Sequence, residues 1–398
     1  MKPNRILLMG IALALSQAVP QAWSQSRYEK SYDDLTEVPA KVFRMTGLEI
    51  LDLHGNNITV LPPEIGRLAD LVRISMEGNE LTGLPPEIGE LTALEELSLS
   101  NNRLESLPPE IGFLESLVEL DLATNQLTGL PPEINDLAYL ENLDLTINKI
   151  TELPEDLSGL ESLTKLSLAK NSLTEFPPAV LDLPSLEKLF LNFNDIRVLP
   201  AGIGGMSSPR DLFLAAANLY ELPPEIGQLD SLEELNLYKN RLSRLPPEFG
   251  QMAGLKYLSL KSNQLSSLPP EFGQLKNLVR ADLDSNQFAT FPSALLGLPN
   301  LAVLRLHNNQ LKKIPAQIGG LTALEILELQ NNQLTALPPE IGRLTNLTTL
   351  YLENNRLTSL PPELGQLTNL QELKLTGNPL GSVPGWIREK LPRTTVTW

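Results

Sequence analysis

Residues 48–70 read LEILDLHGNNITVLPPEIGRLAD, and residues 71–93 read LVRISMEGNELTGLPPEIGELTA. The shared pattern is L-x-x-L-x-L-x-x-N-x-L-x-x-L-P-x-x-I-G-x-L-x-x. It continues without insertion or deletion through fifteen copies, which begin every 23 residues from 48 to 370. A fixed period of this length indicates a solenoid, in which each unit contacts only its two neighbours.

Simple stereochemistry explains the order of residues within one unit. Leu51 and Leu53 are two residues apart, so they point to the same face of a short strand. Leu61 and the prolines that follow it open a short helical or 3₁₀ segment, because proline is tolerated in a first helical turn. Gly66 ends that segment. One unit cannot bury enough apolar surface to fold alone, so we expect stability to come from stacking.

Acidic residues recur at one position of this helical segment, where they face the positive end of the helix dipole. We interpret this column as dipole complementation and solubility, and an acidic stripe for a cationic partner is the alternative. Its members are Glu64, Glu87, Glu110, Glu133, Asp156, Glu225, Glu248, Glu271, Glu340 and Glu363.

The 23-residue pattern resembles the leucine-rich-repeat family, over about residues 35–398. The Leu-Pro-Pro-Glu-Ile-Gly form is similar to bacterial secreted members and to the plant Ras-group-related subclass. The resemblance implies an α/β right-handed solenoid, a horseshoe with a parallel β-sheet on its concave face and short helical or 3₁₀ segments on its convex face. It also implies that the asparagine, for example Asn56, is buried and bonds the backbone of neighbouring turns.

Both ends of the array differ from its middle. Residues 1–24 have a basic start, a short apolar run and small residues before Ser24, which predicts a cleaved signal peptide. Residues 25–47 match the second half of a unit and predict an N-terminal capping half-repeat. The fifteen repeats span 48–392, and residues 393–398 predict a C-terminal capping strand, with Trp386 and Trp398 over the last leucines. The lack of cysteine-rich caps favours a bacterial, secreted or periplasmic protein.

Composition narrows the possible partners. The net charge of −17 argues against nucleic acid and anionic membrane surfaces, which would repel the chain. The absence of cysteine excludes disulfides, thiolate metal sites and a thiol nucleophile. The apolar run near the N-terminus is too short for a membrane helix, so we expect no stable membrane insertion after cleavage. We also expect a monomer.

The sequence contains little catalytic chemistry. His54 and His307 lie eleven units apart, about 50 Å along the sheet, so they cannot share a metal ion or a proton. We interpret each as an ordinary surface histidine. No phosphate-binding glycine-rich motif is present. The expectation is a non-catalytic protein without a cofactor or a metal.

One stretch of the exposed strand positions is aromatic, although only 5% of the chain is. Phe190 and Phe213 occupy the same position in adjacent units, so their rings should lie about 5 Å apart. Phe193 lies in the same unit as Phe190, and Tyr238 and Tyr257 lie one and two units beyond Phe213. These five residues are the predicted partner-binding residues, because exposed aromatic side chains are typical of binding hot spots.

The same region contains the most degenerate unit. Pro209 replaces its first leucine, and Ala217 replaces its asparagine at the end of the run Ala215–Ala217, which we expect to leave room above the sheet. Such departures occur at functional sites. They also arise by drift, with the aromatic rings pairing to shield a flaw, and the sequence leaves both interpretations open.

The leading hypothesis is a scaffold that binds a protein on its concave face. The alternative is a glycan or cell-wall ligand stacked on the aromatic side chains, with polar residues beside them. Those polar residues would be Lys188, Asn192, Asp211, Asn236 and Lys239. A second, more polar candidate area consists of Arg305, His307, Glu328, Tyr351 and Glu353.

Overall fold

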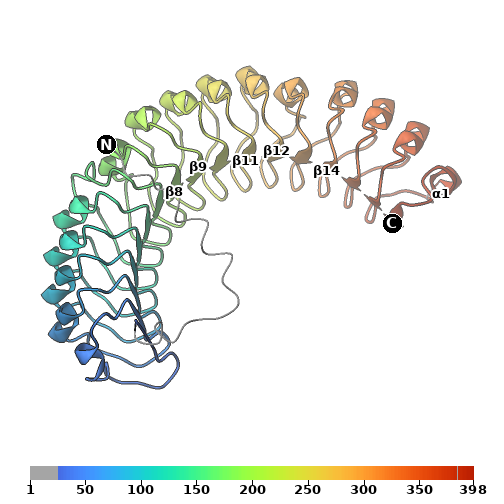
Figure 1. Ribbon diagram of the computed structural model, residues 1–398. Helices are drawn as coiled ribbons and strands as arrows, with labels where there is room; N and C mark the ends of the chain where they lie inside the picture. Colours follow the sequence, from blue (N-terminus) through green and yellow to red (C-terminus); the bar gives the residue numbers. More distant parts are fainter. Residues whose placement is uncertain (1–25, 383) are drawn as a thin grey trace, which may run out of the picture.

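The computed structural model describes residues 26–382 and 384–398, which form one curved solenoid (Figure 1). The predicted signal peptide at 1–24 lies outside the described residues. Within them, no helix is both long enough and apolar enough to cross a membrane.

A single parallel sheet of seventeen three-residue strands lines the concave face. The register advances by 23 residues from each strand to the next, as Leu51 opposite Ile74 shows. The strands are β1 (Arg27–Glu29), β2 (Ile50–Asp52), β3 (Arg73–Ser75), β4 (Glu96–Ser98), β5 (Glu119–Asp121), β6 (Asn142–Asp144), β7 (Lys165–Ser167), β8 (Lys188–Phe190), β9 (Asp211–Phe213), β10 (Glu234–Asn236), β11 (Tyr257–Ser259), β12 (Arg280–Asp282), β13 (Val303–Arg305), β14 (Ile326–Glu328), β15 (Thr349–Tyr351), β16 (Glu372–Lys374) and β17 (Thr395–Thr397).

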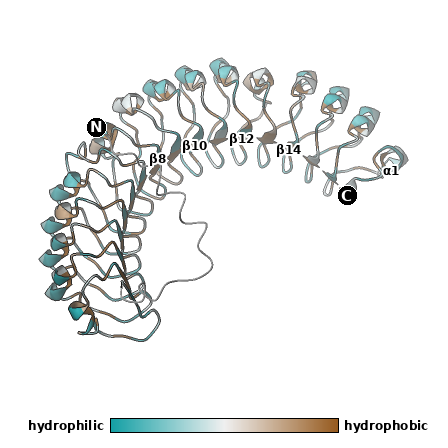
Figure 2. Ribbon diagram, in the orientation of Figure 1, coloured by the Kyte–Doolittle hydropathy of each residue, from teal (hydrophilic) through white to brown (hydrophobic). Residues whose placement is uncertain are grey.

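Short 3₁₀ helices form the convex face and are mostly hydrophilic (Figure 2). Because a helical turn is wider than a strand, stacking the two side by side curves the array with the sheet inside. The helices are η3 (Val42–Arg44), η4 (Pro63–Arg67), η5 (Pro86–Glu90), η6 (Pro109–Phe113), η7 (Pro132–Asp136), η8 (Pro178–Asp182), η9 (Ala201–Gly205), η10 (Pro224–Gln228), η11 (Pro247–Gln251), η12 (Pro270–Gln274), η13 (Ser293–Gly297), η14 (Ala316–Gly320), η15 (Pro339–Arg343) and η16 (Pro362–Gln366), followed by the α-helix α1 (Gly385–Lys390).

The predicted acidic column lies in the first turns of these 3₁₀ helices, as Glu64 does in η4 and Glu225 in η10. Asp156 is the exception. Residues 154–159 contain a bend and a turn but no 3₁₀ helix, and the Asp156 carboxylate accepts the backbone N–H of Ser158 at 2.9 Å. Asp156 therefore stabilises a turn, and the prediction that it complements a helix was wrong.

The core is a continuous column of leucine and isoleucine side chains between the two faces. At its N-terminal end the structure adds a strand that the repeat pattern did not predict, since β1 pairs with β2 and places Tyr28 opposite Leu51. At the other end, β17 pairs with β16. Trp386 packs against the core, but Trp398 is 60% exposed, so the expectation that it covers the last leucines was wrong.

A ladder of buried asparagines joins the turns, as the family resemblance implied. The Nδ2 of Asn79 donates to the carbonyl of Met76 in its own unit at 3.0 Å and to that of Leu53 in the preceding unit at 2.9 Å. Its Oδ1 accepts the N–H of Ile58 at 3.0 Å. Each asparagine therefore satisfies three backbone groups that would otherwise be buried without a partner.

The ladder loses one member at Ala217, which is fully buried. The neighbouring Asn240 compensates in part, because its Oδ1 accepts the N–H groups of both Ala217 and Leu219, at 3.1 and 2.9 Å. The degenerate unit is therefore accommodated without a change in the length of the repeat.

We predict that Asn263→Ala lowers the free energy of unfolding by about 3 kcal/mol, because it leaves three buried backbone groups unpaired. Urea unfolding followed by circular dichroism measures this loss. The control is Asn277→Ala, which removes one exposed hydrogen bond, to the carbonyl of Ala253, and should cost less than about 1 kcal/mol. Equal losses in the two variants would contradict a structural role for the ladder.

Candidate functional site

The predicted aromatic residues divide into three arrangements. Phe190 on β8 and Phe213 on β9 are register partners, and their rings stack with centroids 4.7 Å apart and planes 6° from parallel. The predicted ring pairing is confirmed. Each ring covers one face of the other, so the pair leaves less ring surface open than two separate rings would.

Tyr238 and Tyr257 line a hollow of about 500 Å³ over β10, β11 and β12. Tyr257 is 45% exposed. Lys261 holds its ammonium group 5.9 Å from the centre of the Tyr238 ring, which is within range of a cation–π contact. The hollow therefore combines one open aromatic ring with one that already has a cationic neighbour.

The walls of this hollow are polar and carry both charges. Glu234 lies on one side, at the register position opposite Tyr257, and Arg280 lies on the other. Burial raises the pKa of Glu234, with a further contribution from Asp211 on the adjacent strand. A ligand in the hollow would meet an aromatic ring between a carboxylate and a guanidinium group.

Phe193 lies outside the hollow, three residues past the end of β8, and is 48% exposed. The ammonium group of Lys170, from the preceding unit, is 5.8 Å from the centre of its ring. The alanine run was expected to leave room above β9, but the hollow lies over the next three strands.

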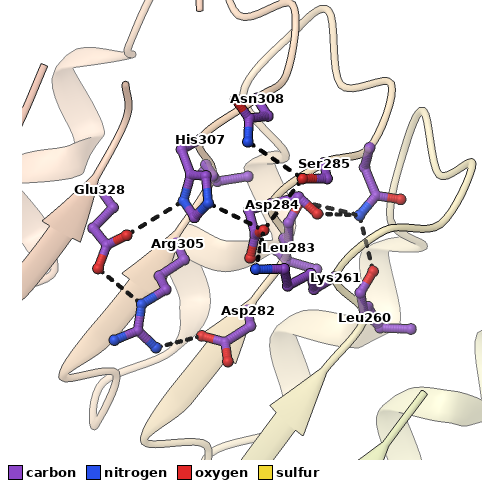
Figure 3. Close-up of polar contacts among 12 residues, drawn as sticks. Leu260, Lys261, Asp282, Leu283, Asp284, Ser285, Arg305, His307, Asn308 and Glu328 are labelled. Carbon is purple, nitrogen blue, oxygen red and sulfur yellow. Dashed lines mark hydrogen bonds and ion pairs between the residues drawn. The ribbon is translucent and has the colours of Figure 1, made fainter. Parts of the chain in front are cut away.

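A network of charged side chains crosses β12, β13 and β14 (Figure 3). Arg305 donates through Nη1 to Asp282 at 2.8 Å and through Nε to Glu328 at 2.8 Å. Arg280 donates to the other oxygen of Asp282 at 2.7 Å. The two arginine side chains therefore neutralise the two carboxylates in this part of the concave face.

His307 is the centre of this network, and the expectation that it is an ordinary surface histidine was wrong. Its side chain is 14% exposed and lies between two carboxylates. Nε2 is 3.1 Å from Asp284, and Nδ1 is 3.3 Å from Glu328. Lys261 also approaches Asp284, at 3.2 Å, and that carboxylate is almost completely buried.

The network holds its members in their charged forms. Burial alone would lower the pKa of His307, but the hydrogen bonds and negative charges of Asp284 and Glu328 outweigh it and raise the pKa to about 9. Burial would likewise raise the pKa of Glu328, yet the hydrogen bonds from His307 and Arg305 lower it to about 2. His307 is therefore a cation at neutral pH.

Tyr351 in the second predicted area is also paired, whereas one buried carboxylate oxygen of Glu353 has no hydrogen-bond partner. The hydroxyl of Tyr351 donates to Glu372, and the ammonium group of Lys374 lies 3.9 Å from the centre of the Tyr351 ring. Among residues 26–382 and 384–398, no group of three histidine, cysteine or acidic side chains could hold a metal ion.

Family models for leucine-rich repeats match most of the chain, at residues 47–68, 69–196, 207–288 and 298–382. A leucine-rich-repeat protein of Leptospira interrogans is 40% identical with a TM-score of 0.89, over 95% of this chain and 98% of that one. The chain belongs to the leucine-rich-repeat family. No curated protein matches it.

Two further leucine-rich-repeat structures have the same architecture. The plant peptide hormone receptor RGFR1, solved in complex with RGF2, is 32% identical with a TM-score of 0.75, over 93% of this chain and 62% of the receptor chain. This chain thus spans less than two thirds of that receptor. The functional domain of InlJ from Listeria monocytogenes is 22% identical with a TM-score of 0.67, over 92% of this chain and 71% of that one, and shows the fold alone.

Leucine-rich-repeat proteins are generally non-catalytic scaffolds that bind on their concave surface. In this member Arg305, His307 and Glu328 were predicted from the sequence, but their partners Asp282 and Asp284 were not. The repeat spacing could have placed them together. Asp282 is the register partner of Arg305, and Asp284 occupies the same repeat position as His307, one unit earlier.

We predict that His307→Gln removes a pH-dependent part of the stability. A pKa raised from 6.5 to about 9 in the folded protein contributes stability that is fully present below pH 6.5 and is lost as the pH rises through 9. The difference in unfolding free energy between the native protein and the variant should therefore be largest at pH 6 and smaller at pH 9.5. Urea unfolding at both pH values tests this, and a constant difference would reject the ion-paired state of His307.

Proposed function

We propose that this protein is a non-catalytic binding scaffold that recognises a protein partner on its concave face, with Tyr238 and Tyr257 as central contacts. The observation that carries the proposal is the hollow over β10–β12, in which Tyr257 is 45% exposed. Large exposed aromatic rings in a concave site, surrounded by polar groups, are typical of binding hot spots.

The stacked pair Phe190–Phe213 and the exposed ring of Phe193 extend this surface toward the N-terminus. Phe213 is the register partner of Asn236, which lines the hollow, so the stacked pair borders the hollow on the adjacent strand. The receptor RGFR1, at 32% identity, was solved in complex with RGF2, and this supports a polypeptide ligand for the present chain. A basic, apolar N-terminal segment supports a secreted or periplasmic location.

A glycan is the second candidate, because the walls of the hollow are rich in hydrogen-bonding groups. Asn236, Ser259, Glu234 and Arg280 surround the two tyrosine rings. Sugar rings stack on aromatic faces while polar side chains bind their hydroxyls. The two candidates differ in the ligand that the isolated protein selects.

We predict that the full chain selects peptides from a random twelve-residue display library, and that Tyr257→Ala weakens their binding at least about tenfold through loss of the exposed ring. Binding of synthetic copies is measured by fluorescence anisotropy. Tyr139→Ala is the matched control, since Tyr139 is also well exposed but lies in a turn after η7. A glycan array is screened in parallel.

The results separate the candidates. The proposal is supported if Tyr257→Ala weakens peptide binding while Tyr139→Ala leaves it unchanged. Glycans bound in a Tyr257-dependent manner, without selected peptides, support the second candidate. Ligands that bind both variants equally would reject a role for the hollow.

A further inference from the structure

Every repeat contains one backbone position that disfavours most side chains. In all fifteen full units, the residue before the buried asparagine, or before Ala217 in the degenerate unit, has a positive φ. This left-handed conformation costs L-residues other than glycine and asparagine about 1 kcal/mol or more. The position lies three residues past the end of each strand, along one rim of the concave face.

Residue types at this position change along the array. Nine of the fifteen units carry glycine, asparagine or serine at this position. The six central units carry none of these three residue types. The nine are Gly55, Gly78, Asn101, Ser262, Ser285, Asn308, Asn331, Asn354 and Gly377. The six, here called the central rim, are Thr124, Ile147, Lys170, Phe193, Ala216 and Lys239.

The C-terminal part of this rim is internally satisfied. Asn354 donates to the side chain of Asn331 at 2.7 Å, and Asn331 donates to that of Asn308 at the same distance. These bonds show that side chains at this position reach one another across adjacent units. They also bind the polar groups of the rim to each other, so fewer are left for a ligand.

The central rim is open and partly apolar. Ile147 is 41% exposed and Phe193 is 48% exposed, with φ of 58° and 59°. A β-branched or aromatic residue in this conformation is unusual. The two lie two strands apart, about 10 Å, with Lys170 between them.

Charge on the central rim is opposite to that of the whole protein. The central rim and the second residue after it in each unit carry four cations over the six central units: Lys149, Lys170, Lys239 and Arg241. The one carboxylate at these two repeat positions, Asp195, is paired with Arg197 at 2.9 Å. The protein as a whole has a net charge of −17.

We propose that the central rim is a contact surface for a partner segment that carries both acidic and apolar side chains. Ile147 and Phe193 receive the apolar groups, and Lys170 and Lys239 face the acidic ones. This inference rests on the proposed function, because it extends the concave binding surface over its rim and specifies the chemistry of the polypeptide.

Backbone conformation supports this assignment independently of charge. Nine units of the same chain show that the fold accepts glycine, asparagine or serine at this position. The central residues are therefore not required by the repeat, and they retain a conformation that disfavours them. Such local strain is typical of functional sites.

The test uses the full chain and two fluorescein-labelled twelve-residue peptides. Both have leucine and phenylalanine at the same positions, and the intervening positions are glutamate in one peptide and lysine in the other. The first variant is Ile147→Asn/Phe193→Asn, the second is Lys170→Gln/Lys239→Gln, and the control is Ser262→Asn, at the same repeat position just outside the central rim. Anisotropy measures binding, and calorimetry measures Tm.

The native chain should bind the glutamate peptide at least about tenfold more tightly than the lysine peptide. Ile147→Asn/Phe193→Asn should raise Tm by about 2 °C through relief of backbone strain. The same variant should weaken binding of the glutamate peptide about tenfold. Lys170→Gln/Lys239→Gln should abolish the preference for glutamate. Ser262→Asn should leave binding unchanged.

Equal binding of the two peptides, or binding of neither, would overturn the proposal. So would unchanged binding by the two rim variants. Loss of the glutamate peptide in Tyr257→Ala, together with unchanged binding by both rim variants, would overturn the rim surface and leave the proposed function of the hollow intact.

Discussion

The buried side-chain amide of the asparagine column is the interaction on which the rest of the structure depends. Its Nδ2 reaches a carbonyl 26 residues back, and its Oδ1 reaches an N–H group 21 residues back, as Asn102 shows with Met76 and Leu81. One inserted residue would break both bonds while the amide stayed buried, at a cost of several kcal/mol. The constant length of 23 residues follows from this geometry, and so does the alignment of side chains in straight columns across the sheet.

Column alignment explains what the sequence predicted well. The repeat spacing alone placed Phe190 beside Phe213, and the structure confirms their stacking. The hollow was harder to predict from the sequence, because it depends on how the volumes of side chains at one repeat position change from unit to unit. That column falls from Phe213 to the smaller Asn236 and Ser259, and space opens there. The strand β1 was missed because Arg27–Glu29 lacks the leucine pattern, and its pairing depends on Tyr28 packing against the core.

The burial of His307 could not be predicted either, since it depends on which carboxylates turn toward the ring. Repeat spacing identifies neighbours, but rotamers decide between solvent and an ion pair. Because Asp284 and Glu328 both point inward, the face over β12–β14 cancels its own charge. A self-neutralised surface attracts charged partners weakly, as the long-range fields of its members oppose one another. Recognition by charge is then favoured where cations remain open, around Lys170 and Lys239 on the central units.

The same central units are where the asparagine ladder is incomplete, at Ala217. Fourteen of the fifteen units keep the ladder asparagine, and the nine units outside the centre place glycine, asparagine or serine at the left-handed turn before it. In the central units the turn position carries other residue types, and one of these units also lacks the asparagine, at Ala217, while the leucine core remains intact. Drift that affected folding alone would have no reason to place aromatic, aliphatic and cationic side chains together on one open edge. The exposed ring of Phe193 at one of these unusual turn positions therefore supports the proposed binding role of the central units.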